Sequence, residues 1–177
     1  MFREMRRFKQ QLSDTDARQV LKNGHRGTLS LIGDEGYPYG LPINYFYGSD
    51  GRIYMHCAPI GHKIDAMHHC DKVSFTVIED QSKHPKAQAG TETGMTATGQ
   101  LKPAEDFALY VKSVIVFGRI ALVEDRQKVA RLAMDLAMHI YPEQRDFYRS
   151  DLERNIDRVQ ILEITPEHIS GKLVHER

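Results

Sequence analysis

Three short β-type runs joined by tight turns are the feature that most limits how this chain can fold. The runs cover residues 28–32, 39–47 and 52–57, and the turn sequences GDEG and GSDG separate them. Glycine, aspartate and serine are typical turn residues. A parallel crossover needs about a dozen residues or more, so these connections are too short to hold one. The segment therefore predicts an antiparallel meander.

Further β-rich runs follow at 72–78, 107–124 and 158–164. Gly118 lies inside the longest of them and predicts a bulge or a close backbone approach. The last run alternates cleanly between apolar and polar residues, and the sequence TPEHISGK after it predicts a capped turn. In total the pattern predicts about six antiparallel strands.

Helical patterns occur at 12–24, 62–70 and 124–143, and the polar residues 143–156 also have helical character. Ser13 and Asp125 are suitable N-caps for the first and third of these helices. Gly24 and Pro142 are stop signals at their ends. With so few helices, we expect them to lie at the periphery of a sheet.

The predicted fold is therefore mainly β with peripheral helices, and a closed or half-closed barrel fits because closure removes open sheet edges. A length of 177 residues predicts a single domain spanning 1–177. Residues 79–103 are polar, rich in glycine and threonine, and poorly periodic. We interpret them as a long excursion of the kind that is usually functional or mobile.

Charge and composition narrow the possible partners. Lys and Arg number 24, as do Asp and Glu, so no long-range field favours nucleic acid or a membrane surface. The basic sequence MFREMRRFKQQ precedes no apolar stretch, and no run is long enough to cross a bilayer. The two cysteines, Cys57 and Cys70, form no disulfide framework, which predicts a reducing, cytoplasmic setting.

The segment HCAPIGHKIDAM at 56–67 concentrates chemically active side chains. Residues of metal-ligand type in and after it are His56, Cys57, His62, His68, His69 and Cys70. Their spacing contains no CxxC and no HExxH, and adjacent histidines on a helix point to different sides. We therefore expect no protein-built metal site.

A cysteine nucleophile is also disfavoured. His56 and Cys57 are neighbours on an expected strand, so their side chains point to opposite faces and cannot pair directly. The sequence contains no GxSxG and no recognisable cysteine-hydrolase signature. Cys57 is expected to be a small packed residue instead.

Gly61, His62 and Lys63 form a possible phosphate site. Glycine allows a ligand close to the backbone, and the free N–H groups at a helix start favour an anion. Lys63 would add a full positive charge. Judged from these residues alone, a surface lysine at a helix start is an equally good interpretation.

Four longer motifs follow one another along the chain: GYPYGLPINYFY, GRIYMHCAPIGHKIDAMHHCDKVSFTV, YVKSVIVFGRIALVED and ILEITPEHISGK. Their order resembles the pyridoxamine 5′-phosphate oxidase-like superfamily, and most closely its Nim-type flavoproteins, which are related to 5-nitroimidazole resistance. The resemblance covers nearly the whole chain. It implies a six-stranded antiparallel split β-barrel that binds FMN, and a homodimer with FMN at the subunit interface.

The resemblance also implies positions for the FMN contacts. The strand Leu41–Pro42–Ile43–Asn44–Tyr45 should run beside the isoalloxazine ring, with Asn44 as the best side-chain contact. Met55, His56 and Cys57 should pass the ribityl chain and the ring. Gly61, His62 and Lys63 should bind the phosphate, and Tyr110, Ser113 and Val114 should approach FMN from the partner subunit.

The chain departs from the true pyridoxamine phosphate oxidases. These enzymes carry an arginine where Leu41 stands, and they hold flavin and substrate with Trp and Arg residues near the C-terminus. This chain has no tryptophan and ends in SGKLVHER. Oxidation of pyridoxamine phosphate is therefore not expected.

The function that follows is an FMN-dependent reductase acting on small electrophiles such as nitroaromatics. His56 is the predicted proton donor, and a strand-end histidine bonded to a backbone carbonyl is the alternative. Another possibility is a flavin- or haem-binding module without turnover, with His56, His62, His68, His69 or His84 as a haem ligand. A structural dimer with a vestigial pocket is a third.

Overall fold

A computed structural model describes residues 2–81 and 109–176, so most of the expected excursion at 79–103 lies outside the described residues. The strands are β1 (Arg26–Ile32), β2 (Pro38–Asn44), β3 (Phe46–Tyr47), β4 (Ile53–Cys57), β5 (Lys72–Asp80), β6 (Leu109–Leu122) and β7 (Gln160–Glu176). The helices are α1 (Asp14–Asn23), α2 (His62–His69), α3 (Arg126–Ile140) and α4 (Arg145–Asn155). Four 3-10 turns complete the order: η1 (Phe8–Gln10), η2 (Asp34–Gly36), η3 (Pro142–Gln144) and η4 (Ile156–Arg158).

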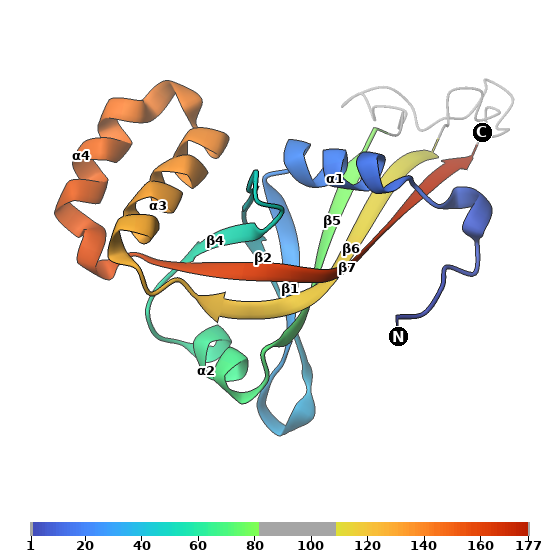
Figure 1. Ribbon diagram of the computed structural model, residues 1–177, viewed down its shortest axis with the longest axis horizontal. Coiled ribbons are helices and arrows are strands. Elements are labelled where there is room, and N and C mark those ends of the chain that lie inside the picture. The colour runs from blue at the N-terminus through green and yellow to red at the C-terminus, as the bar shows by residue number, and fades with distance from the viewer. Residues whose placement is uncertain (1, 82–108, 177) are drawn as a thin grey trace, which may run out of the picture.

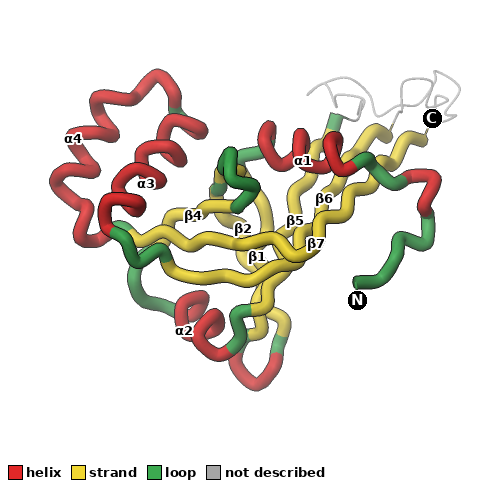
Figure 2. The backbone as a smooth tube through the Cα atoms, viewed as in Figure 1, coloured by secondary structure: helices red, strands yellow, loops and turns green. Residues whose placement is uncertain are grey.

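The strands form one antiparallel, seven-stranded sheet in the order β2-β1-β5-β6-β7-β4-β3. Figures 1 and 2 show the sheet curling, with α3 and α4 side by side above one end, α2 below and α1 over the other end. The prediction of a mainly β split barrel is confirmed. The expected run 39–47 is two strands, β2 and β3, which gives seven strands instead of six.

Tyr45 is the junction that leaves the barrel split. The two outermost strands, β2 and β3, are consecutive in the chain, and Tyr45 alone separates them. At this residue the chain leaves its partner β1 and joins β4. The sheet is therefore closed by the covalent chain, while the edges of β2 and β4 remain unpaired with each other. We call this gap the seam.

Apolar side chains fill the inside of the curl. Leu29, Phe75, Met55, Val114 and Ile164 are completely buried in the main core cluster. Strands β1 and β5 alternate between buried and less buried residues, as expected for a sheet with one buried face. This core holds the strands that carry the seam.

The first helix is fixed at both ends by groups that the sequence predicts. The Ser13 Oγ accepts a hydrogen bond from the Asp16 N–H at 3.1 Å, and Gly24 follows the last helical residue. Ala17, Val20 and Leu21 are buried and pack the helix on the sheet. The expected cap and apolar face are both confirmed.

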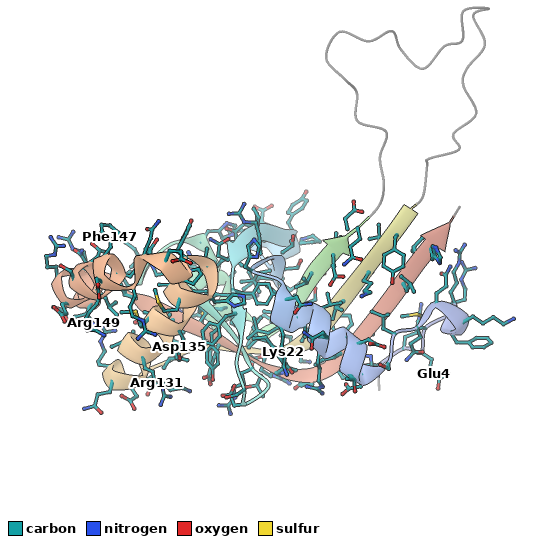
Figure 3. All side chains as sticks on the ribbon, turned by 90° about the horizontal axis from the view of Figure 1, so that it is seen from above. Glu4, Lys22, Arg131, Asp135, Phe147 and Arg149 are labelled. Atoms are coloured by element: carbon teal, nitrogen blue, oxygen red, sulfur yellow. The ribbon has the colours of Figure 1, made fainter. Side chains whose placement is uncertain are left out.

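The third helix also begins as predicted. Asp125 accepts hydrogen bonds from the backbone N–H groups of Gln127 and Lys128. Val129, Leu132 and Leu136 are buried, whereas α4 contains no buried residue. Figure 3 shows the side chains of Phe147 and Arg149 on this outer helix, whose main contacts are with α3 and the turns η3 and η4.

The predicted capped turn after residue 164 is wrong, because β7 continues to Glu176. The register between β6 and β7 shifts between Phe117 and Gly118, and Glu167 is the extra residue on β7. Pro166 lies beside this bulge, where the regular pattern of ladder hydrogen bonds is interrupted. The predicted irregularity at Gly118 is confirmed, and it explains how a proline is accommodated in a long strand.

The expected start of the excursion at residue 79 is also corrected. Strand β5 runs to Asp80, where it still pairs with Val111 of β6. The Gln81 N–H then donates to the Tyr110 carbonyl at 2.9 Å. None of the described helices is long and apolar enough to cross a membrane.

Candidate functional site

Backbone groups of β2 point into the seam at every second residue. The Tyr45 N–H donates to the His25 carbonyl at 3.1 Å, which fixes the odd-numbered residues of β2 as those bonded to β1. The backbone groups of Gly40, Pro42 and Asn44 therefore face away from β1. Since Pro42 has no N–H, its position offers only a carbonyl acceptor.

The end of β4 faces the same gap. The Gly48 N–H donates to the Arg52 carbonyl at 2.8 Å, which sets the alternation along β4. Every second residue of β4 turns its backbone groups to the same side, so Arg52, Tyr54 and His56 share one side. The N–H and carbonyl of His56 therefore point away from β7. Strand β3 ends its pairing opposite Ile53 and Tyr54, and His56 is beyond its reach.

A cavity of about 590 Å³ opens beside the seam, within the range of small-molecule sites. Its strand wall contains Arg26, Pro42, Ile43, Asn44 and His56. Its other wall comes mainly from α3 and α4 and is largely apolar. The structure thus brings together Pro42, Ile43, Asn44 and His56, all of which the sequence predicts as flavin contacts.

Asn44 is oriented by a residue that the sequence interpretation missed. Arg26 donates from Nε to the Asn44 Oδ1 at 2.9 Å, which directs the Asn44 amide nitrogen elsewhere. The two residues are paired across β1 and β2 although 18 positions separate them. No local motif marks Arg26, and only the hairpin register would have indicated this contact.

His56 is exposed, yet its pKa is lowered. The larger cause of the lowered pKa is that neighbouring protein atoms displace water from the imidazole. The positive charge of Lys63 lowers the pKa further. The imidazole is therefore neutral at pH 7, with one nitrogen able to donate and the other able to accept. The same Lys63 charge reaches the thiol of Cys57, where burial nevertheless raises the pKa.

Four predicted contacts have side chains turned into the protein. Tyr45, Met55 and Cys57 are buried, and Leu41 packs on the main core cluster. The Tyr45 hydroxyl donates to the Leu21 carbonyl at 2.9 Å, which ties the seam to α1. By the alternation described above, the backbone groups of these four residues face β1 or β7, so they support the site without reaching the seam.

The start of α2 has free donors. Gly61 has a φ of 122° and no atom lies within 4 Å of a Cβ built on it, so the backbone is open to a ligand. The Gly61 carbonyl accepts the N–H groups of Ile64 and Asp65. The N–H groups of His62 and Lys63 come before these in the first turn, where an anion is favoured.

The ring of His62 is already engaged. It stacks on Tyr39 with the ring centres 4.1 Å apart, and its Nε2 lies 3.6 Å from the Asp34 carboxylate. Both contacts tie α2 to the β1–β2 hairpin. His62 therefore offers a ligand its backbone N–H more readily than its imidazole.

Tyr110, Ser113 and Val114 lie on β6 and do not line the cavity. Val114 is completely buried inside its own protomer, whereas Ser113 is half-buried and on the opposite face of the strand. Whether a partner subunit brings Ser113 to this site is a question of assembly, and it stays a prediction.

The other histidines considered as metal or haem ligands do not line the cavity within the described residues. His68 and His69 are exposed at the end of α2, and His84 lies outside the described residues. Within residues 2–81 and 109–176, no group of three His, Cys, Asp or Glu side chains is arranged to hold a metal ion.

The fold and the site define the class of protein: a split β-barrel with a small-molecule cavity at its seam. A family model described as pyridoxamine 5′-phosphate oxidase matches residues 13–173. The chain belongs to this family. Comparison with curated proteins finds no match.

Several solved structures have a similar fold. A candidate 5-nitroimidazole antibiotic resistance protein from Bacteroides thetaiotaomicron is 17% identical with a TM-score of 0.67, covering 93% of this chain and 87% of that one. The flavocytochrome Anf3 from Azotobacter vinelandii is 17% identical with a TM-score of 0.71, over 97% and 72% of the two chains. A FAD-binding protein from Mesorhizobium loti is 24% identical with a TM-score of 0.54, over 93% and 96%.

Proposed function

We propose that the protein binds FMN at the seam and acts as an oxidoreductase that reduces small electrophiles such as nitroaromatics. The observation that carries this proposal is the cavity that gathers Pro42, Ile43, Asn44 and His56 beside unpaired backbone groups. The family membership and the similarity to a candidate nitroimidazole resistance protein and a FAD-binding protein support it.

The polar edge of the ring would lie along β2. A flavin ring has one N–H donor between two carbonyl acceptors, so it needs both an acceptor and donors from the strand. The Pro42 carbonyl is such an acceptor, and the amide nitrogen of Asn44 is a donor left free by the contact of Arg26 with Oδ1. The cavity and the polar groups of the seam therefore fit this cofactor.

The phosphate would lie at the start of α2. The backbone N–H groups of His62 and Lys63, together with the Lys63 ammonium, supply donors and positive charge. Lys63 is close enough to lower the pKa of His56, which connects this helix start electrostatically to the cavity.

When bound, FMN would supply the two-electron chemistry, and this chain would bind, orient and shield the reactants. Reduction of a nitro group to a nitroso group takes up two electrons and two protons and releases water. His56 is neutral at pH 7, so its ring N–H can hydrogen-bond to a substrate oxygen that gains negative charge. We retain it as the proposed proton donor.

A homodimer would complete the site. On the face of the sheet that points away from the core, two adjacent rows of residues cross the five strands β2, β1, β5, β6 and β7 without any Lys, Arg, Asp or Glu. These rows comprise Thr28, Ser30, Gly40, Pro42, Ser74, Thr76, Ile115, Phe117, His168 and Ser170. Depletion of charge is typical of the centre of an interface. Ile115→Asp should therefore give a monomer by light scattering, and an unchanged dimer would contradict this arrangement.

The first test is the colour of the protein. Protein mixed with excess FMN should retain flavin absorbance after gel filtration, and a colourless protein fraction would contradict the proposal. Anaerobic photoreduction followed by a nitroaromatic should restore the oxidised spectrum faster than the free flavin does. A slow or absent recovery would leave a flavin-binding protein without this reductase activity.

The second test separates the phosphate from the ring. Lys63→Ala should weaken FMN binding roughly ten- to hundredfold, because a charge-assisted contact is lost. Riboflavin, which lacks the phosphate, should bind both proteins alike. Lys72→Ala, which removes an exposed lysine at the start of β5, is the matched control and should bind FMN as the wild type does. Equal loss with both ligands would contradict the phosphate assignment.

A haem-binding module is the second candidate. Of the histidines within the described residues that could ligate haem, His56 alone lines the cavity, and Met134 lines it too. The similarity to a flavocytochrome is compatible with this alternative. A sharp Soret band after reconstitution with haemin, absent in His56→Ala, would favour it over the flavin proposal.

A further inference from the structure

The charge of Arg26 is an unassigned feature of the cavity. Its Nε is bonded to Asn44, and no other hydrogen bond or ion pair joins its guanidinium to the part of the chain that the structure describes. The side chain is exposed and lines the cavity. Because Asn44 fixes Nε, the two terminal nitrogens form a free fork of the kind that binds carboxylates through two parallel hydrogen bonds.

Asp151 also lines the cavity, but its carboxylate does not pair with the Arg26 guanidinium. Asp151 accepts a hydrogen bond from the Asn155 amide at 2.9 Å, one turn along α4. It makes no ion pair with Arg26 among the described residues. The strand wall is therefore the positive side of the cavity.

The apolar walls favour a flat ligand body. Ala133 and Ala137 lie one helical turn apart on the same side of α3, so this part of the wall is shallow. Pro42 and Ile43 line the opposite strand wall. With the proposed flavin ring along this strand wall, a planar substrate ring would lie between the flavin and the helix face at Ala133 and Ala137. The polar substituent of the substrate would then reach Arg26.

We infer that the helix side of the cavity, opposite the proposed flavin ring, is the substrate pocket and that it selects planar aromatic carboxylates, with the carboxylate on the Arg26 guanidinium and the ring against Ala133 and Ala137. The inference rests on the proposed flavin site at the seam and narrows its substrate class. It makes Arg26 a specificity-determining residue that is distinct from the phosphate site at Lys63.

The test uses flavin-loaded protein and two probes of nearly equal shape, 4-nitrobenzoate and neutral 4-nitrobenzamide, titrated by calorimetry. Wild-type protein should bind the carboxylate at least about tenfold more tightly. Arg26→Gln should bind both probes alike. Arg26→Lys should keep part of the preference, because it retains the charge and loses the fork. Arg131→Gln, on the exposed side of α3, is the matched control and should keep all of it (Figure 3).

Flavin content measured in the same samples separates the two proposals. A yellow wild type with equal affinity for both probes overturns the inference and leaves the flavin proposal standing. A colourless wild type overturns the flavin proposal, while calorimetry still reports whether Arg26 selects the carboxylate. Loss of flavin from Arg26→Gln would assign Arg26 to the cofactor and overturn its role toward substrate. If Arg26→Gln does not fold, Arg26→Lys is used in its place, and a carboxylate preference as strong as that of the wild type would overturn the inference.

Discussion

The middle of the sheet and its seam contain the same kind of strand but use it differently. In the middle, β1, β5, β6 and β7 each pair on both sides, and most of their inward side chains are buried. At the seam, β2 pairs on one side only, and β4 has no partner beyond Tyr54 on its second side. The middle therefore supplies stability, and the seam supplies unsatisfied backbone groups to a ligand.

This difference separates two kinds of mutational effect. Changes in the middle remove packing and should lower the free energy of unfolding. Changes at the seam should alter binding or the local pKa with little cost in stability. The predictions below test that separation from the largest expected effect to the smallest.

Phe75→Ala should have the largest effect. The ring is fully buried between strands, so its removal leaves a cavity and should lower the free energy of unfolding by about 3–5 kcal/mol. Phe147→Ala makes the same change on exposed α4 and should cost less than about 0.5 kcal/mol. Urea unfolding measures both, and equal costs would show that the middle does not dominate stability.

Tyr45→Phe tests the junction itself. It leaves the Leu21 carbonyl without its partner and should cost about 1–2 kcal/mol. Burial raises the pKa of Tyr45, so the folded protein keeps the phenol neutral when the unfolded chain ionises near pH 10. Stability should therefore fall as pH rises above about 10, and Tyr45→Phe should lack part of that fall.

The control for this junction is Tyr37→Phe, because Tyr37 is highly exposed. It should change neither the stability at pH 7 nor the alkaline fall. Burial also raises the pKa of Tyr54 to about 12, so a residual alkaline fall in Tyr45→Phe is expected. An alkaline profile identical to that of the wild type would contradict the role of Tyr45.

Lys63→Ala should raise the pKa of His56 toward its ordinary value. The Lys63 charge disfavours the protonated imidazole, and its removal leaves only the effect of lost solvation. Titration of the His56 ring protons by NMR measures the change. Lys72→Ala should leave this pKa where it is, and an unchanged value in Lys63→Ala would show that α2 and the seam are not coupled.

Asp34→Asn should have the smallest effect. The pair with His62 is mostly exposed, so stability should change by less than about 0.5 kcal/mol. Removing one negative charge near the proposed phosphate position should tighten FMN binding by about twofold. Urea unfolding and FMN titration measure the two, and a large loss of stability would mean that the hairpin contact is structural.

The sequence predicts the regular elements well where local chemistry decides them. Ser13 and Asp125 cap their helices as expected, and Gly118 lies at an irregularity of β6. The capped turn after residue 164 was wrong because Pro166 and Gly171 are local breakers. Pairing with β6 across a bulge overrides that local preference.

The site is less predictable because it depends on residues far apart in the chain. The resemblance indicates Asn44 and His56, and these two line the cavity. Nothing local marks Arg26, whose position matters only after β1 pairs with β2. The contribution of Ala133 and Ala137 likewise depends on how α3 packs over the seam, which a helical pattern alone does not fix.

The spacing of the prolines in β2 has a consequence for association between chains. An unpaired strand edge is a template on which a strand of another molecule can add. Pro38 and Pro42 both fall at positions that face away from β1, so this edge lacks every second donor that a continuous intermolecular ladder would need. A small ligand requires only a few of these groups. The edge can therefore stay open for a ligand while resisting strand addition and the aggregation that follows from it.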